Sequence, residues 1–257
     1  MSEPLVLVDL TDPQISVLTL NRPDKRNALS IELIEQLRDG FTSASSDRNR
    51  RVVLIRANGP VFCAGLDLKE ATDPTKAHSS AVGLFEMYRT VATSPLITVA
   101  SAHGGAFGGG AGLVAACDFV VAAPDLRLGY PEVHRGLVAA LVTTLLRRQL
   151  GERVVRELVL LGQTVDAARA LQLGLINRIG AFDDALSLAR EACAGAPGAI
   201  ARSKRLLDSL SARTIEEDLK RALDFHLNAR QSHEAAEGMK AFLEKRPLKW
   251  GPRDEDA

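Results

Sequence analysis

Two glycine-rich turns carry the residue types best suited to chemistry in this sequence. The first, Phe62–Leu68, follows an apolar run, and the second, Gly108–Gly110, opens an apolar helix. Small residues let a ligand approach the main chain, and a helix amino terminus offers unpaired N–H groups and a favourable dipole. Two such turns that face each other can bind an oxyanion through one N–H group from each. Glycine-rich turns often serve close packing alone, so either turn by itself leaves both interpretations open.

Other common site motifs are absent from the sequence. The glycines of Gly104–Gly112 do not fit GxGxxG, and there is neither a P-loop Gly-Lys nor a GxSxG motif. The run His233–Glu237 lacks the second histidine of HExxH. The five histidines are scattered and the cysteines do not cluster, so we expect no metal site.

The composition is that of an ordinary globular protein without net charge. Of 257 residues, 46% are hydrophobic and 25% are charged, and Lys+Arg and Asp+Glu both total 32. This balance gives no overall attraction to nucleic acid or to an anionic membrane, and no apolar run approaches the length of a membrane span. We therefore expect neither as a partner. The three widely spaced cysteines and a start without a signal-peptide pattern favour the reducing cytoplasm.

Strands that alternate with helices must position the two turns. Apolar runs predict strands at Leu5–Leu10, Ile15–Leu20, Val52–Ile55, Leu96–Ala100 and Phe119–Ala122. The third run is continuous, which is typical of a strand buried on both faces of an α/β sheet. Ser30 is expected to cap a helix with one apolar face, formed by Leu33, Ile34, Leu37 and Phe41. Further helices are expected near Ala77–Thr93 and from the Gly104–Gly112 turn through Ala116.

The pattern is mostly helical beyond Val138. Thr164 is expected to cap a helix over Val165–Leu173, which ends at Gly174 in the left-handed conformation. A short strand at Leu175–Ile179 follows.

The carboxyl-terminal third is predicted to form three or four amphipathic helices over Phe182–Leu243, with Pro197 between two of them. Because these helices are long rather than compact, we expect them to pack on another subunit as well as on their own core. We divide the chain into a core of residues 1–190 and a helical oligomerisation segment of residues 191–257.

Four segments in this order resemble the enoyl-CoA hydratase/isomerase (crotonase) superfamily. They are Asn21–Leu29, the turn Phe62–Leu68, the run Gly104–Asp118, and Tyr130–Val133 followed by Gly136. Ala167, Leu171, Gly174, Leu175 and the ending Lys245-Arg246-Pro247 fit as well. The resemblance covers almost the whole chain. It implies an α/β fold with a β-β-α spiral core and a carboxyl-terminal helical segment, assembled as a trimer or a dimer of trimers.

The resemblance also assigns the reacting groups. The amides of Leu66 and Gly109 match the oxyanion hole, which binds a thioester oxygen as it gains enolate charge. Glu132 matches the glutamate that moves the proton. A lone carboxylate in an apolar cleft is expected to have a raised pKa, which suits proton transfer. Family members of this kind need no metal or redox cofactor, because coenzyme A is part of the substrate.

Further residues are expected to bind the acyl-CoA thioester. Lys25 and Arg26 are candidates for its phosphates, and the backbone near Ala28 and Ala64 for its adenine and pantetheine. Phe242 and Lys245 resemble late residues that reach the coenzyme A of a neighbouring subunit. The neighbours of the reacting groups complete the predicted site: Asp67, Leu68 and Pro131.

One position departs from the two-glutamate hydratases of the superfamily. These carry a second glutamate twenty positions before the first, which here is Gly112. The missing carboxylate helps to hold the attacking water, so Gly112→Glu is expected to restore it and to increase hydration of crotonyl-CoA. Replacement groups are conceivable at Glu70, Glu86 or His134, although most such residues are simply solvated.

Three functions remain open on this basis. Enoyl-CoA hydratase acting on short-chain or branched 2-enoyl-CoA is preferred, because Gly108–Asp118 and Pro131–Val133 resemble methylglutaconyl-CoA-type hydratases, some of which have glycine at position 112. Δ3-Δ2-enoyl-CoA isomerase is the alternative, since those enzymes use one glutamate at the position of Glu132. A non-catalytic crotonase-like binding protein is the third, and the retained Glu132 and both glycine turns argue against it.

Overall fold

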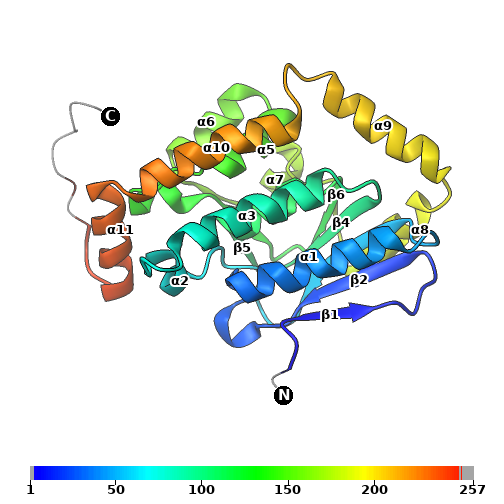
Figure 1. Cartoon of the computed structure of the whole chain (residues 1–257), viewed down its shortest axis with the longest axis horizontal. Coiled ribbons are helices and arrows are strands. Elements are labelled where there is room, and N and C mark those ends of the chain that lie inside the picture. Colours follow the sequence, from blue (N-terminus) through cyan, green and yellow to red (C-terminus); the bar gives the residue numbers. More distant parts are fainter. Residues whose placement is uncertain (1–2, 249, 251–257) are drawn as a thin grey trace.

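Six strands form the main sheet of the protein, in the order β1-β2-β3-β4-β6-β9 (Figure 1). They are β1 (Val6–Asp9), β2 (Ile15–Leu20), β3 (Val52–Ala57), β4 (Ile97–Ala102), β6 (Phe119–Ala122) and β9 (Arg178–Ile179). β1 pairs antiparallel with β2, and all later neighbours pair parallel. The computed structural model describes residues 3–248 and 250. The first five strands lie where the sequence predicts them, with ends that differ by at most two residues, whereas β9 occupies only the end of the predicted Leu175–Ile179 strand.

Helices cover both faces of this sheet, as the apolar runs predict. α1 (Ile31–Ser46) and α3 (Ala77–Ala92) lie against each other on one face, and α8 (Phe182–Ala192) packs on β3, β4 and β6 from the other. Val52, Val53, Leu54 and Ile55 of β3 are fully buried, because successive side chains enter opposite cores. The Ser30 hydroxyl accepts a hydrogen bond from the Leu33 amide at 3.2 Å, which confirms the predicted cap of α1.

A second, three-stranded sheet was not predicted. It consists of β5 (Gly105–Phe107), β7 (Arg127–Gly129) and β8 (Thr164–Asp166). β5 lies inside the segment that the sequence indicates to be a turn. The predicted cap at Thr164 is wrong: Thr164 opens β8, and the Asp166 side chain accepts from the Arg169 amide at 2.8 Å to cap α7 (Ala167–Leu173). Gly174 ends α7 in the left-handed conformation, as predicted (φ 81°).

The remaining helices connect the sheets and extend beyond them. They are α2 (Leu68–Thr72), α4 (Gly109–Ala116), α5 (Ala140–Gln149), α6 (Glu152–Leu160), and the 3₁₀ turns η1 (Pro23–Lys25) and η2 (Pro131–Arg135). Three helices follow α8: α9 (Pro197–Ser209), α10 (Ile215–Arg230) and α11 (His233–Glu244). The four helices of Phe182–Leu243 agree with the prediction, except that Pro197 begins α9 rather than preceding it.

The carboxyl-terminal helices are not detached from the rest of the chain. α10 packs against α3 and α5, and α11 packs against η2 (Figure 1). The division of the chain between residues 190 and 191 stays a prediction. The predicted helical segment 191–257 includes residues 251–257, which lie outside the described range. Within that range, none of the helices combines the length and the hydropathy needed to cross a membrane.

Candidate active site

The two glycine-rich turns meet, as the sequence predicts. The Cys63 amide donates to the Gly105 carbonyl at 3.0 Å, and the Phe107 amide donates to the Cys63 carbonyl at 3.0 Å. A Cβ atom built on Gly65 would lie 3.4 Å from the Gly109 nitrogen, and one built on Gly109 would lie 3.5 Å from the Leu66 nitrogen. The amides of Leu66 and Gly109 therefore lie next to each other although they are far apart in sequence.

Both amides are available to a ligand. Within the described part of the chain, neither the Leu66 nor the Gly109 N–H donates a hydrogen bond to a protein group. The Leu66 turn is held by its neighbours instead, because the Leu29 amide donates to the Gly65 carbonyl at 2.8 Å and the Asp67 amide to the Leu29 carbonyl at 3.1 Å. Gly109 is the first residue of α4, whose unpaired amino-terminal N–H groups favour negative charge.

Glycine is required by close contacts at two positions of this segment. Gly108 has a φ of 51°, which disfavours other residues, and a Cβ there would lie 3.1 Å from Glu132 Oε1. A Cβ on Gly110 would overlap the Cys63 carbonyl oxygen and lie 2.7 Å from Cys63 Sγ. Burial raises the pKa of the Cys63 thiol to about 12, so this cysteine packs as a neutral group.

A cleft of about 710 Å³ opens over the two amides. It is lined by all but one of the predicted site residues: Lys25, Arg26, Ala28, Ala64, Leu66, Asp67, Leu68, Gly109, Pro131, Glu132 and Phe242. The exception is Lys245, which lines a neighbouring pocket of about 340 Å³ that shares Pro131, Arg135 and Phe242 with the cleft. Phe242 is thus placed at the cleft of its own chain.

Glu132 is the perturbed carboxyl group of the cleft. Its Oε2 atom is buried and has no hydrogen-bond partner among the described residues. Burial raises the pKa of Glu132 to about 7, against smaller opposing effects of its own backbone N–H and of the Arg135 guanidinium. A carboxyl group with a pKa near neutrality can both take up and release a proton at physiological pH.

The other carboxylates of the lining are engaged elsewhere. Asp67 accepts from Arg22 at 2.7 Å and caps α2 through a hydrogen bond from the Lys69 amide at 3.0 Å. The pKa of Asp67 is lowered, because its bonds with Arg22 and the α2 amides outweigh the opposing effect of burial. Asp24 lies 3.8 Å from Lys25 in an exposed pair, which contributes little to stability.

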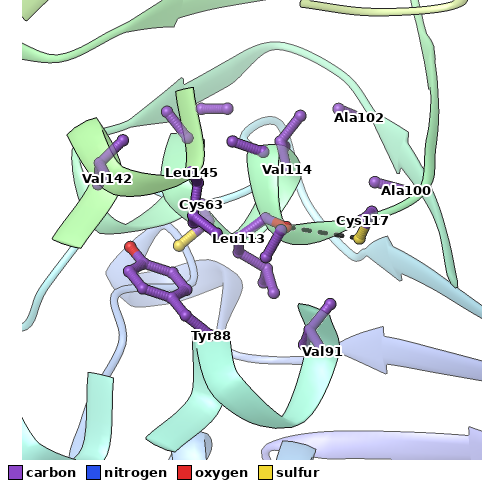
Figure 2. Close-up of a cluster of buried hydrophobic side chains, with 14 of the residues drawn as sticks. Cys63, Tyr88, Val91, Ala100, Ala102, Leu113, Val114, Cys117, Val142 and Leu145 are labelled. Atoms are coloured by element: carbon purple, nitrogen blue, oxygen red, sulfur yellow. Dashed lines mark hydrogen bonds between the residues drawn. The ribbon is translucent and has the colours of Figure 1, made fainter. Parts of the chain in front are cut away.

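Tyr88 occupies the space beside Gly112. A Cβ on Gly112 would overlap the Tyr88 hydroxyl and lie 2.9 Å from Val142 Cγ2. Figure 2 shows Tyr88 reaching from α3 toward Cys63 and Val142. A glutamate at position 112 therefore has to displace the Tyr88 side chain, and the expected gain in hydration by Gly112→Glu stays a prediction.

The three possible replacement groups lie elsewhere. Glu70 accepts from the Ile31 amide at 2.7 Å, and Glu86 forms an ion pair with Arg89 at 2.6 Å. His134 faces the neighbouring pocket that contains Lys245.

Several cleft residues were missed by the sequence analysis. They include Arg22, Lys69, Phe107, Arg135, Leu137 and Thr164. Arg22 lies inside the opening motif, so its place in the motif was a usable signal. Arg135, whose guanidinium lies 4.3 Å from the Phe242 ring centroid, reaches the cleft through packing between η2 and α11, which no local pattern reveals.

Comparison with known proteins identifies the relatives of this chain. The family model for enoyl-CoA hydratase/isomerase matches residues 11–253. The chain belongs to the enoyl-CoA hydratase/isomerase family. A provisionally named enoyl-CoA hydratase of Thermus thermophilus is 36% identical over 250 residues, which cover 94% of this chain and 99% of the relative.

Solved structures of relatives share the fold of this enoyl-CoA hydratase/isomerase. An enoyl-CoA hydratase from Mycobacterium avium superposes with a TM-score of 0.84 at 34% identity, covering 97% of this chain and 100% of the other. A carnitinyl-CoA hydratase from Mycobacterium avium gives a TM-score of 0.83 at 30% identity, with 98% and 100% covered. The predicted crotonase fold is confirmed, and the protein is an acyl-CoA enzyme of the hydratase/isomerase type.

Proposed function

We propose that this protein is an enoyl-CoA hydratase that adds water to short-chain or branched 2-enoyl-CoA thioesters. The observation that carries the proposal is the convergence of two unpaired amides, Leu66 and Gly109, beside Glu132, whose pKa is about 7. A thioester oxygen that accepts a hydrogen bond from each of the two amides places the conjugated carbons within the same cleft as the carboxylate.

The chemistry follows from these three groups. Ionised Glu132 takes a proton from a water molecule as the water oxygen attacks the β-carbon of the substrate. The electron pair of the double bond moves toward the thioester oxygen, whose enolate charge the two amides stabilise. Glu132 then returns the proton to the α-carbon, which regenerates the carboxylate. A pKa near 7 serves both steps, since the same group acts as base and as acid.

The cleft offers a separate region for coenzyme A. Lys25 and Arg26 are exposed on the η1 turn and supply positive charge for the phosphates. The Ala64 amide donates to the Arg26 carbonyl at 3.0 Å, which ties this turn to the Phe62–Leu68 turn. Substrate binding therefore spans two loops whose mutual position is fixed by backbone hydrogen bonds. We expect catalysis without a metal or redox cofactor; unchanged activity after dialysis against a chelator tests the first, and the absorbance spectrum of the purified protein tests the second.

Isomerisation of 3-enoyl-CoA is the second candidate function. It is favoured by the small number of free carboxylates in the cleft. Of the acidic residues that line the cleft in the described range, Asp67 is ion-paired and Asp24 is exposed, which leaves Glu132. A single free carboxylate is sufficient to move one proton between two carbons. Hydration requires in addition that the water be held by Glu132 and the backbone.

A panel of thioesters separates the two reactions. Crotonyl-CoA and branched 2-enoyl-CoA esters lose the absorbance of the conjugated thioester on hydration, whereas 3-enoyl-CoA esters gain it on isomerisation. We expect turnover of the 2-enoyl esters to be the faster. Turnover of the 3-enoyl esters alone would show that the enzyme is an isomerase. If neither class of ester is turned over but acetoacetyl-CoA raises the melting temperature, the protein binds acyl-CoA without catalysing either reaction.

The assembly proposed for this enzyme is a trimer or a dimer of trimers in the cytoplasm. Support comes from apolar side chains that stay exposed in the single chain, with Leu207 of α9 at 69% and Leu210 after it at 75%. Such contiguous exposed residues are typical of surfaces that another protein covers.

A further inference from the structure

Tyr88 connects α3 to the turn Gly108–Gly110, which contains the oxyanion residue Gly109 and is hereafter called the oxyanion turn. Its side chain is fully buried, and its hydroxyl donates to the Gly109 carbonyl at 2.8 Å. Gly109 is further enclosed by two leucines, since a Cβ there would lie 3.2 Å from Leu29 Cδ1 and 3.5 Å from Leu84 Cδ1. Gly109 has no side chain of its own, so these contacts help the backbone of α4 to hold its peptide groups in place.

The same hydroxyl occupies the space that the first side-chain carbon of any residue other than glycine would need at position 112. A Cβ on Gly112 would overlap the Tyr88 hydroxyl, and the Tyr88 ring carbon Cζ would lie 2.5 Å away. Gly112 lies on α4, one turn after Gly109, so one tyrosine contacts both the oxyanion residue and the glycine that replaces the second glutamate. α3 carries no other residue with these two contacts in the described range.

We infer that Tyr88 is a positioning residue for the oxyanion turn and that the pair Tyr88–Gly112 commits this site to a single carboxylate. The inference rests on the proposed function for its catalytic part. Tyr88 does not line the cleft, so it acts through Gly109 rather than on the substrate. Because Tyr88 and a side chain at position 112 exclude each other, a change at either position alone disturbs the turn.

Tyr88→Phe tests the positioning role, because it removes the hydroxyl and keeps the ring. We expect kcat to fall by roughly 10- to 100-fold, less than the complete loss of an oxyanion donor, since the turn is misplaced rather than removed. KM and the affinity for a saturated acyl-CoA are expected to stay within about threefold, because the ground-state thioester depends little on an exact oxyanion geometry. A role in stability alone lowers the melting temperature and leaves kcat unchanged.

Ser80→Ala is the matched control. Ser80 lies on the same helix, α3, and is as buried as Tyr88, but its hydroxyl has no hydrogen-bond partner among the described residues. Removing an unpaired hydroxyl costs little, so we expect kcat within about twofold of the wild type. An equal fall of kcat in both variants overturns the inference, because the effect then does not depend on the bond to Gly109.

Thermal melts test the mutual exclusion without any assay of activity. Gly112→Glu is expected to lower Tm by roughly 4–10 °C, as expected of overpacking in a core. The double variant Tyr88→Ala/Gly112→Glu is expected to lose less Tm than the sum of the losses in the two single variants, since the removed ring makes room for the new side chain. If Gly112→Glu does not fold, Gly112→Ala makes the same comparison with one methyl group.

The kinetic and the thermal experiments distinguish failure of the proposed function from failure of the inference about Tyr88. Wild-type protein that turns over no enoyl-CoA refutes the proposed function, and the melts still decide whether Tyr88 and Gly112 exclude each other. Active wild-type protein with an unchanged kcat in Tyr88→Phe refutes the positioning role alone. Strictly additive losses of Tm in the double variant refute the exclusion.

Discussion

The segment Gly104–Gly112 and the helix α9 meet their surroundings in opposite ways. The glycines of the first are enclosed by their own chain: a Cβ on Gly104 would overlap the Pro60 carbonyl, and one on Gly110 the Cys63 carbonyl. α9 has no buried residue, and Leu206 and Leu207 on it are 59% and 69% exposed. Residues of the same chain pack against the glycine segment, whereas the leucines of α9 remain exposed to solvent in the single chain. Chemistry and assembly are therefore expected to be separable by mutation.

The largest effect is expected inside the enclosed region, at Glu132. Glu132→Gln keeps the shape of the side chain but cannot take up a proton, so turnover should fall by about 10²–10⁴-fold while acyl-CoA binding persists. Steady-state kinetics and a thermal shift with acetoacetyl-CoA measure the two. Glu35→Gln, an exposed residue on α1, serves as the control and should behave as wild type. Near-normal turnover of Glu132→Gln would remove Glu132 from the mechanism.

The pH dependence of the same residue sharpens this test. Because burial raises the pKa of Glu132 to about 7, base catalysis should fall about tenfold for each pH unit below that value. Stability changes in the opposite sense. The folded chain holds this proton more tightly than the unfolded chain, whose pKa is near 4.5. Wild type should therefore lose stability relative to Glu132→Gln as the pH rises from 4.5 to about 7, with no further change above. Melting temperatures of the wild type and Glu132→Gln that change with pH in the same way would contradict the burial of the Glu132 carboxyl group.

A smaller effect, on folding stability, is expected from adding one methyl group to the enclosed segment. Gly110→Ala places a Cβ against the Cys63 carbonyl and thiol, and such overpacking costs about 1–3 kcal/mol. Gly83→Ala is the matched control, because its Cβ would lie 3.7 Å from Ile34 in ordinary contact. At that helical position the change should stabilise by about 0.5–1 kcal/mol. Chemical denaturation measures the free energy of unfolding of both variants. Equal values would show that the backbone around Gly110 can shift to accommodate the methyl group.

The smallest effect on activity is expected from the exposed helix. Leu207→Ser/Leu210→Ser should leave the melting of the single chain almost unchanged, since both side chains are mostly exposed, but should weaken the assembly. Light scattering of the wild type, this variant and Val8→Ser, an exposed residue on β1, gives the comparison. The same subunit number in all three proteins would show that this part of the surface is not an interface.

Local patterns predicted the elements whose signal is local. The apolar run of β3 and the Ser30 cap are examples, because burial on both faces and a hydroxyl before a helix leave marks in a few consecutive residues. The three-residue strands β5, β7 and β8 were missed, since their pairing joins segments far apart in sequence. Thr164 was assigned to a cap for the same reason: its pairing partner in β7 is Gly129.

The candidate site was predicted to a similar extent. Glycine turns and Glu132 are recognisable by type and order, and the structure brings them into one cleft. Tyr88 gave no signal, because it lies among the apolar residues of α3 and its two contacts reach α4. Its importance depends on where α3 and α4 meet, which tertiary packing determines.

The cleft has walls from both ends of the chain, with Arg22 at its start and Phe242 near its finish. A polypeptide that leaves the ribosome from its amino terminus therefore presents both glycine turns long before α11 has been synthesised. Contacts between residues so distant in sequence form late and slow down folding. During that interval the cleft lacks the part of its wall that Phe242 supplies, and incompletely folded chains with exposed apolar surface are prone to aggregate.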